Sequence, residues 1–221
     1  MGELVVAVDG PSGSGKSSTA RGVASRLGLR YLDTGAMYRA VTWALLERGV
    51  DVDDPEAVAQ AAAEVRIDAG TDPSHPTIHA DGIDVSVPIR EQAVTSAVSA
   101  VSAVPEVRVL MVARQREAIG DGGIVVEGRD IGSVVAPDAH LKIYLVADSG
   151  ARAHRRAAEQ GLSGEVAATQ ADLVRRDAFD SGRKASPLTQ AADAVVVDST
   201  HLSLEQVIDA IVDMIPAGSR P

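Results

Sequence analysis

A glycine-rich run near the N-terminus has the residue types and spacing of a phosphate-binding loop. Residues 10–17 fit the pattern G-x-x-x-x-G-K-[ST] at every fixed position. Glycines let successive backbone N–H groups surround a phosphate, and the start of a following helix adds positive potential. Lys16 would reach the β- and γ-phosphates of a nucleoside triphosphate, and the Ser17 hydroxyl would bind Mg²⁺. The residues expected to hold the triphosphate are Gly10, Pro11, Ser12, Gly13, Ser14, Gly15, Lys16, Ser17 and Ser18.

The segments around this phosphate loop (residues 10–18) must place it at the edge of a sheet. An apolar, β-branched run at 4–8 predicts a buried strand before the loop, and 19–27 predict a helix after it. The alternation of strands and helices predicts an α/β fold. It has a doubly wound parallel sheet of about five strands, helices on both faces and the nucleotide at its carboxyl edge. The other predicted strands of this sheet lie at 29–33, 123–127, 140–146 and 194–198.

The stretch from 65 to 88 differs in character from the rest of the chain. Three short strands at 65–68, 77–79 and 83–87, separated by turn-rich segments, predict a small antiparallel insertion. Such an insertion is too small to fold alone. Asp54 before Pro55, and a capping box that begins at Ser203, mark two helix starts. The predicted helices outside the loop region cover 36–48, 55–65, 90–103, 106–119, 150–160, 165–180 and 204–215.

The composition narrows the class of partner. The 221 residues carry a net charge of −10, which argues against a general nucleic-acid binder. Arginines nevertheless cluster at 108–116, 152–156 and 175–184, and local basic patches in an acidic protein suit a small polyanionic ligand. The chain has no cysteine and no apolar run of transmembrane length. We therefore expect a cytoplasmic monomer that binds neither nucleic acid nor membranes.

The phosphate loop alone does not separate motors, GTPases and small kinases. A GTPase reads guanine with N-K-x-D, and this chain contains no asparagine and no D-x-x-G element. Large motor ATPases need further modules that 221 residues cannot carry. A small kinase is therefore the class that fits best.

Four motifs occur together in one order: 10–17, 32–39, 126–132 and 175–187. In this set the chain resembles the bacterial cytidylate kinases, P-loop nucleoside monophosphate kinases that use ATP and Mg²⁺ to convert CMP or dCMP to the diphosphate. The resemblance extends over essentially the whole chain. It implies a P-loop kinase fold with a core at 1–35, 104–150 and 187–221. It also implies a monophosphate-binding region at 36–103, with the insertion near 65–88, and an α-helical lid at 151–186.

The resemblance also implies the acceptor residues. Arg39, Arg129 and Arg183 would hold the CMP phosphate with Thr34, which stands where serine is usual. Ser99, Arg108 and Asp130 would read cytosine, and Arg176 and Asp180 would contact the ribose. A carboxylate at Asp130 can accept from the cytosine amine, whereas uracil would turn an oxygen toward it. The CMP-binding residues implied in this way are Thr34, Arg39, Ser99, Arg108, Arg129, Asp130, Arg176, Asp180 and Arg183.

Transfer between two nucleotides needs positioning and charge neutralisation more than proton transfer. The acceptor phosphate is already a nucleophile, so we expect no general base. Arg155 and Arg156 of the lid are expected to bind ATP, but adjacent helical residues cannot share one face, and we expect one of them to point into solvent. Asp33 would either hold a Mg²⁺-bound water or only end its strand. The residues expected to carry the rate are Lys16, Arg129, Arg155 and Arg183.

Two other functions remain open from the residues. One is a P-loop kinase that acts on another nucleoside monophosphate or on a small metabolite. The other is a nucleotide-binding regulatory module without transferase activity. Ser99, Arg108 and Asp130, which would read cytosine, are the residues that favour a CMP kinase over these two alternatives.

Overall fold

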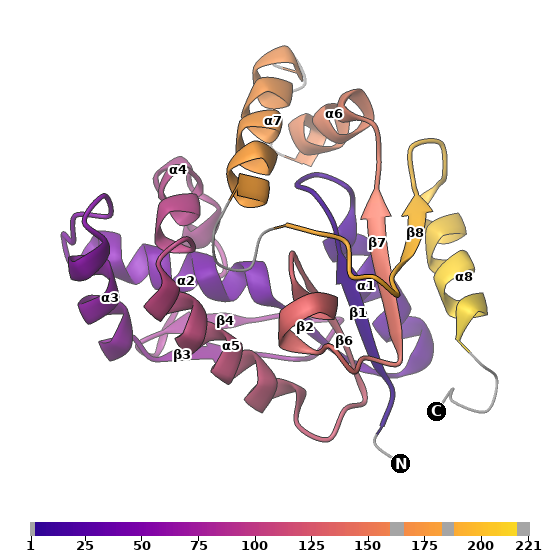
Figure 1. Cartoon of the computed structure of the whole chain (residues 1–221), viewed down its shortest axis with the longest axis horizontal. Coiled ribbons are helices and arrows are strands. Elements are labelled where there is room, and N and C mark those ends of the chain that lie inside the picture. Colours follow the sequence, from indigo (N-terminus) through magenta and orange to yellow (C-terminus); the bar gives the residue numbers. More distant parts are fainter. Residues whose placement is uncertain (1–2, 160–165, 183–187, 216–221) are drawn as a thin grey trace.

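The computed structural model describes residues 3–159, 166–182 and 188–215. Five parallel strands form the main sheet, in the order β2-β6-β1-β7-β8 (Figure 1). This confirms the predicted strand number, and each strand begins one residue later than predicted. Arg183, expected at the acceptor phosphate, lies outside the described residues. The strands of the main sheet are β1 Val5–Asp9, β2 Arg30–Asp33, β6 Ile124–Gly128, β7 Leu141–Val146 and β8 Val195–Asp198.

Successive residues of β1 point into two different cores. Ala7 packs with Leu32 and Val126 on the side covered by α2 and α5, whereas Val6 and Val8 pack on the side covered by α1 and α8. Side chains alternate along a strand, so a sheet covered on both faces needs apolar residues at every position. The helices that cover the two faces are α1 Lys16–Leu27, α2 Thr34–Glu47, α5 Pro105–Ile119 and α8 Leu204–Met214.

The predicted antiparallel insertion is confirmed as a three-stranded sheet in the order β3-β4-β5. Its last strand ends at Asp84, three residues before the predicted end. The chain turns instead into a 3₁₀-helix that begins at Pro88, a residue without a backbone N–H for strand pairing. The elements of this region are α3 Pro55–Glu64, β3 Ile67–Ala69, β4 Ile78–Ala80, β5 Ile83–Asp84 and α4 Gln92–Val101.

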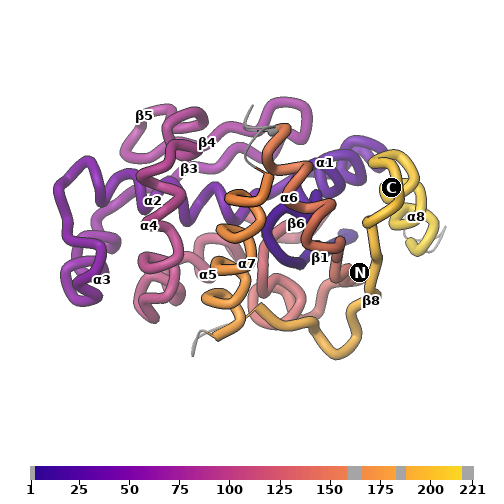
Figure 2. The backbone as a smooth tube through the Cα atoms, turned by 90° about the horizontal axis from the view of Figure 1, so that it is seen from above, coloured from indigo at the N-terminus to yellow at the C-terminus, as the bar shows by residue number. Residues whose placement is uncertain are grey.

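Two helices, α6 (Ser149–Glu159) and α7 (Val166–Gly182), lie above the carboxyl ends of the strands (Figure 1). From above, they run side by side over the middle of the molecule, between α4 and α8 (Figure 2). Their position brings them over the phosphate loop. Segments far apart in the sequence therefore surround one edge of the sheet.

The starts of α3 and α8 follow their local sequence signals. Asp54 caps α3 through the backbone N–H of Glu56, and Ser203 and Gln206 form the predicted capping box. Such caps satisfy N–H groups that have no partner within the helix. Among the described residues, no single helix is long and apolar enough to cross a membrane, although α4 and α5, bent by 101°, pass that test together.

A turn that the sequence analysis did not predict follows β6. Residues Ile131–Val135 form one π-helical turn. The buried carboxylate of Asp9 accepts hydrogen bonds from the N–H groups of Ile131 and Gly132, both at 2.8 Å. This partner lies at the end of β1, far away in the sequence, so local periodicity could not reveal the turn.

Candidate active site

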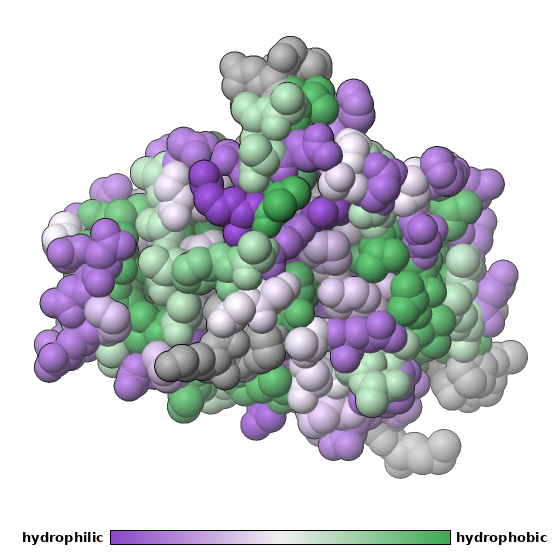
Figure 3. Space-filling view, turned by 45° about the horizontal axis from the view of Figure 1, so that its top comes forward, coloured by the Kyte–Doolittle hydropathy of each residue, from purple (hydrophilic) through white to green (hydrophobic). Residues whose placement is uncertain are grey.

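A cavity opens at the carboxyl edge of the sheet, and strongly hydrophilic side chains gather below the projecting helices there (Figure 3). It brings together most of the residues predicted from sequence. Of the predicted residues that the structure describes, four do not line it, namely Gly10, Pro11, Ser14 and Arg155. Those that line it are Ser12, Gly13, Gly15, Lys16, Ser17, Ser18, Asp33, Thr34, Arg39, Ser99, Arg108, Arg129, Asp130, Arg156, Arg176 and Asp180.

The phosphate loop connects the end of β1 to the start of α1, as predicted. Gly15 immediately precedes α1 with a φ of 92°, a left-handed conformation that favours glycine. At Gly10, a Cβ atom would lie 2.1 Å from the carbonyl oxygen of Leu145 on β7. Both positions therefore require glycine, one for its backbone angle and the other for close packing against β7.

Lys16 is turned back onto its own loop. Its Nζ donates a hydrogen bond to the carbonyl oxygen of Pro11 at 2.8 Å. Burial and, next, the positive charge of Arg129 lower the pKa of Lys16 from its usual value. Burial and the nearby Asp33 carboxylate raise the pKa of Glu127. A partly buried cation and a buried carboxyl therefore lie together beneath the loop.

Oxygen atoms suited to a hard cation surround Ser17. Glu127 accepts a hydrogen bond from the Tyr31 hydroxyl, and the Ser17 side chain acts to lower the pKa of Glu127. Asp33 lines the same cavity, although one of its oxygens already accepts the Ala36 N–H at 2.8 Å and caps α2. The position of Asp33 is compatible both with holding a Mg²⁺-bound water and with a purely structural role at the end of β2. Glu127 was missed from the sequence, yet it lies near the carboxyl end of β6, beside β1, where such a ligand is expected.

A buried ion pair occupies the acceptor side. The Arg108 guanidinium pairs with the Asp130 carboxylate, and both side chains are buried. Arg108 also donates to the carbonyl oxygen of Ser102 at 3.2 Å and lies over the Tyr38 ring, 5.4 Å from its centre. The Asp130 side chain makes no capping hydrogen bond to the turn that follows it. The Asp130 carboxylate therefore lines the cavity and does not cap the turn.

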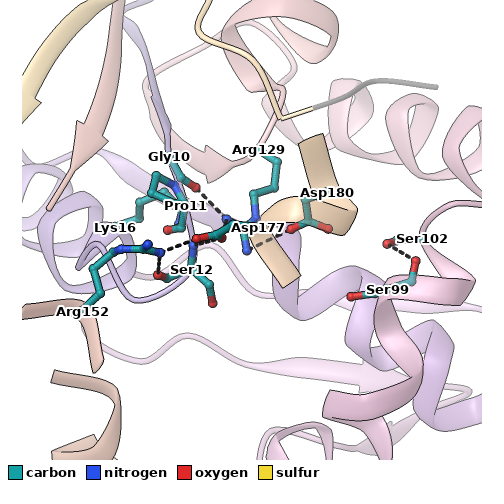
Figure 4. Close-up of polar contacts among 10 residues, drawn as sticks. All are labelled: Gly10, Pro11, Ser12, Lys16, Ser99, Ser102, Arg129, Arg152, Asp177 and Asp180. Atoms are coloured by element: carbon teal, nitrogen blue, oxygen red, sulfur yellow. Dashed lines mark hydrogen bonds and ion pairs between the residues drawn. The ribbon is translucent and has the colours of Figure 1, made fainter. Parts of the chain in front are cut away.

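Ser99 lines the same cavity as the Arg108–Asp130 pair. The Ser102 hydroxyl donates to the Ser99 carbonyl oxygen at 3.2 Å (Figure 4). Ser102 and Tyr38 also line the cavity, and the sequence analysis named neither. Tyr38 lies on α2 beside the predicted Arg39, and Ser102 caps the end of α4, three residues after the predicted Ser99, so spacing from these residues was the signal available.

Three arginines from different elements face one another in the cavity. Arg39 donates to the carbonyl oxygen of Ile89 at 2.9 Å and to the Thr95 hydroxyl at 3.0 Å. Burial, followed by the charges of Arg176 and Arg156, lowers the pKa of Arg39 to about 9. Like charges brought this close favour an anion between them. This region is suited to a phosphate group.

The expectation that Arg155 or Arg156 points into solvent is wrong. Both are partly buried, and Arg156 lines the cavity with Arg39. Arg155 turns the other way and donates to the carbonyl oxygen of Ser199 at 2.6 Å and to that of Ser14 at 3.4 Å. The two side chains do leave α6 on different faces. The face that carries Arg155 is covered by the phosphate loop and by Ser199, which follows β8.

Thr34 is the first residue of α2 and is buried. Its hydroxyl donates to the carbonyl oxygen of Glu127 at 2.7 Å. A Cβ atom at Gly128 would lie 2.6 Å from this hydroxyl oxygen. The close approach of α2 to the end of β6 therefore fixes Thr34 at the floor of the cavity.

Helix α7 contributes carboxylates to the phosphate loop. Asp180 pairs with Arg129 at 3.2 Å, and Asp177 accepts the Ser12 N–H at 3.0 Å. Arg129 also donates to the carbonyl oxygen of Gly10 at 2.9 Å (Figure 4). Asp177 and its ion-pair partner Arg152 were missed, because no local pattern shows which face of α7 meets a loop 165 residues away.

Comparison with known proteins shows the family of the chain. The cytidylate kinase family model matches residues 6–217. The chain is 60% identical over 214 residues to "Cytidylate kinase" of Streptomyces griseus, covering 96% of this chain and 92% of that protein. It is 57% identical to "Cytidylate kinase" of Nocardia farcinica, covering 94% and 91%. An uncharacterized protein from Eubacterium ventriosum, 10% identical, shares the fold with a TM-score of 0.51, covering 96% of this chain and 100% of that one. The chain belongs to the cytidylate kinase family.

Proposed function

We propose that this protein transfers the γ-phosphate of ATP to CMP or dCMP and produces CDP or dCDP with ADP. The observation that carries the proposal is the buried pair of Arg108 and Asp130, which shares one cavity with the phosphate loop. A donor and an acceptor beside each other match the edge of cytosine, whose exocyclic amine donates and whose N3 and O2 accept. The names and identities of the relatives agree with this substrate.

The phosphate loop holds ATP in this proposal. Its backbone amides and Lys16 bind the phosphates, after Lys16 exchanges the Pro11 carbonyl for a phosphate oxygen. Arg155 supports the loop from α6, since its Nη1 would lie 3.8 Å from a Cβ at Gly15. We assign Arg156 to the facing phosphates of both nucleotides, because it lines the cavity together with Arg39.

Mg²⁺ fits the oxygen donors near Ser17. A hydroxyl and one or two carboxylates, completed by phosphates and waters, are typical of Mg²⁺ sites in kinases. No group of three His, Cys, Asp or Glu side chains that would hold a metal by itself occurs in the described part of the chain. Ser17 would bind the ion, and Asp33 and Glu127 would hold its waters. The bound ion would supply positive charge to the phosphates.

The acceptor phosphate lies among arginines in this proposal. Arg39 of α2 and Arg129, which directly follows β6, both line the cavity, and one guanidinium group can bind two phosphate oxygens. Thr34 contributes a hydroxyl, Asp180 and Arg176 contact the ribose, and Ser99 contacts the base. Arg183 completes the set as an inference from sequence. The nucleophile is the acceptor phosphate itself, so the residues position and neutralise charge without a general base.

The division of the chain follows from the same proposal. The core (1–35, 104–150 and 187–221) holds ATP, the region 36–103 holds the monophosphate, and 151–186 act as a lid that excludes water. One chain supplies both halves of the site, which supports a monomer as the working unit. Closure over the phosphates would limit loss of the phosphoryl group to water.

A panel of acceptors tests the proposed activity. ADP release by the purified protein is measured with ATP, Mg²⁺ and either CMP, dCMP, UMP, AMP or shikimate. We expect CMP and dCMP to give the highest kcat/KM. Faster turnover of another acceptor would assign a different kinase, and ADP release that no acceptor stimulates would indicate a regulatory module.

Two variants assign the chemistry within that assay. Lys16→Ala should lower kcat by about 100-fold or more, because it removes charge stabilisation from the transferred group. Asp130→Ala should reduce kcat/KM for CMP much more than for UMP. Equal losses for the two nucleotides would show that Asp130 supports the structure and does not read the base. Circular dichroism establishes that both variants fold.

A further inference from the structure

The Arg39 guanidinium group, which lines the acceptor side of the cavity, is held by two neutral oxygen atoms. Its Nη1 atom donates to the carbonyl oxygen of Ile89 at 2.9 Å and to the Thr95 hydroxyl at 3.0 Å. Both contacts use the same nitrogen, so neither takes up the Nη2 end of the group. Ile89 belongs to the 3₁₀-helix Pro88–Arg90 and Thr95 to α4, and both elements pack against α2, which carries Arg39 (Figure 1). A segment 50 to 56 residues further along the chain therefore fixes the direction of this side chain.

The partners of Arg39 differ in charge from those of two other arginines in the same cavity. Arg108 pairs with the Asp130 carboxylate, and Arg129 pairs with Asp180. Within the described residues, no carboxylate lies within ion-pair distance of Arg39. An ion pair neutralises a guanidinium group, whereas a carbonyl and a hydroxyl orient it and leave its unit charge in place. Arg39 is therefore fixed in direction without being neutralised.

The surroundings of Arg39 make its direction important for an anion. Burial and, next, the charges of Arg176 and Arg156 lower the pKa of Arg39 to about 9, and the Asp33 carboxylate opposes this shift with a smaller effect. A partly buried cation among like charges attracts an anion with little screening by water. A phosphate must also lie in line with the planar fork of the guanidinium group to accept two hydrogen bonds from it. A contact that sets the rotamer of Arg39 therefore acts on phosphate binding.

We propose that Thr95 is a positioning residue for the acceptor phosphate: its hydroxyl holds the Arg39 guanidinium group in place and, because it is neutral, leaves the positive charge of Arg39 to the phosphate. This inference rests on the proposed binding of the CMP phosphate by Arg39. A side chain that is already oriented loses less conformational entropy when its ligand binds, so Thr95 acts on the affinity for the acceptor. ATP is assigned to other residues, so its KM does not respond to Thr95.

The test compares substitutions of Thr95 in the full chain. Thr95→Val keeps the branched shape and removes the hydroxyl, whereas Thr95→Ser keeps the hydroxyl. We expect Thr95→Val to raise the KM and the Kd for CMP about tenfold, the effect of one hydrogen bond to a charged group, and to leave kcat and the KM for ATP within about twofold of the wild type. Thr95→Ser should retain the wild-type values. ADP release measures kcat and KM, and titration calorimetry measures the Kd for CMP.

Thr95→Asp separates the orientation of Arg39 from its charge. A carboxylate at this position can accept the same hydrogen bond but neutralises the guanidinium group, so we expect this variant to bind CMP more weakly than Thr95→Val does. Ser96→Ala is the matched control. It removes a hydroxyl from the next residue of α4, which is exposed and accepts from Gln92 at 3.2 Å, and it should leave all of these constants unchanged.

Three results would overturn the inference. They are a Thr95→Val variant with the wild-type Kd for CMP, equal losses in Thr95→Val and Thr95→Ser, and a KM for ATP that rises as much as the KM for CMP, which would mean that Thr95 only supports the fold. Thr95→Ala removes the hydroxyl with less bulk and gives the same comparison if Thr95→Val does not fold, as judged by circular dichroism. A wild type that does not phosphorylate CMP would instead contradict the proposed function itself.

Discussion

Asp9 shows how one buried carboxyl connects the two halves of the site. It ends β1 directly before the phosphate loop, and it accepts the N–H groups that open the turn after Asp130. Burial is the main reason that the pKa of Asp9 rises to about 6, and the Asp130 carboxylate adds to it, whereas the two backbone hydrogen bonds act in the opposite direction. Asp9 therefore fixes the turn at 131–135 next to the phosphate loop. Its burial makes the carboxyl harder to ionise.

This raised pKa predicts a pH-dependent stability. A carboxyl whose pKa is higher in the folded state stabilises the fold below its unfolded pKa, and that contribution is lost as the pH rises through the folded value of about 6. The unfolding free energy of the wild type, minus that of Asp9→Asn, should therefore fall by about 2 kcal/mol from pH 4 to pH 7. Urea unfolding at several pH values measures it. The lost hydrogen bonds give a constant offset, so a difference that does not change with pH would contradict the prediction.

At the scale of elements, α1 carries the phosphate loop at its first turn and is held from behind by α8. The two helices approach at Gly22, where a Cβ atom would lie 2.2 Å from the Cδ1 atom of Ile208. The predicted bounds of both helices came from periodicity and caps, which are local. Their close contact could not be predicted in this way, because it depends on how β8 places α8 against the sheet.

Gly22→Ala tests this contact. Alanine is the better helix former, so a free helix would gain stability, but here the added methyl overlaps Ile208. We expect the unfolding free energy to drop by about 1–3 kcal/mol. Adding Ile208→Val, which removes the atom nearest the new methyl, should recover part of the loss. Ser25→Ala on the exposed face of α1 is the control for helix propensity. A stabilised Gly22→Ala variant would contradict the expected overlap.

Over the whole molecule, Arg129 links the two nucleotide halves. One of its nitrogens donates to the Gly10 carbonyl at the phosphate loop, and another pairs with Asp180 on α7. Either nucleotide would therefore disturb a network that also extends into the other half. The second nucleotide then binds to a network already rearranged by the first.

This connection predicts cooperative binding. A non-hydrolysable ATP analogue together with CMP should raise Tm by about 3 °C more than the sum of the two separate rises. That excess corresponds to a coupling of about 1 kcal/mol. Thermal unfolding followed by the fluorescence of Trp43, the only tryptophan, measures the shifts. The analogue with UMP serves as the comparison, and strictly additive shifts would argue against coupling through Arg129.

Much of the protein was determined by the sequence alone. The strands, most helix bounds and the glycines of the phosphate loop follow from short-range patterns, because alternation, capping and backbone freedom act over a few residues. The acceptor arginines and Asp130 could be named because whole motifs resemble a family. Tertiary structure decided which face of α6 and α7 meets the loop, and so the partners of Arg155 and Asp177. The pairing of β2 with β6 likewise decided that Tyr31 meets Glu127. These contacts join residues from distant segments, and only the pairing of strands and the packing of helices on the finished sheet bring them together.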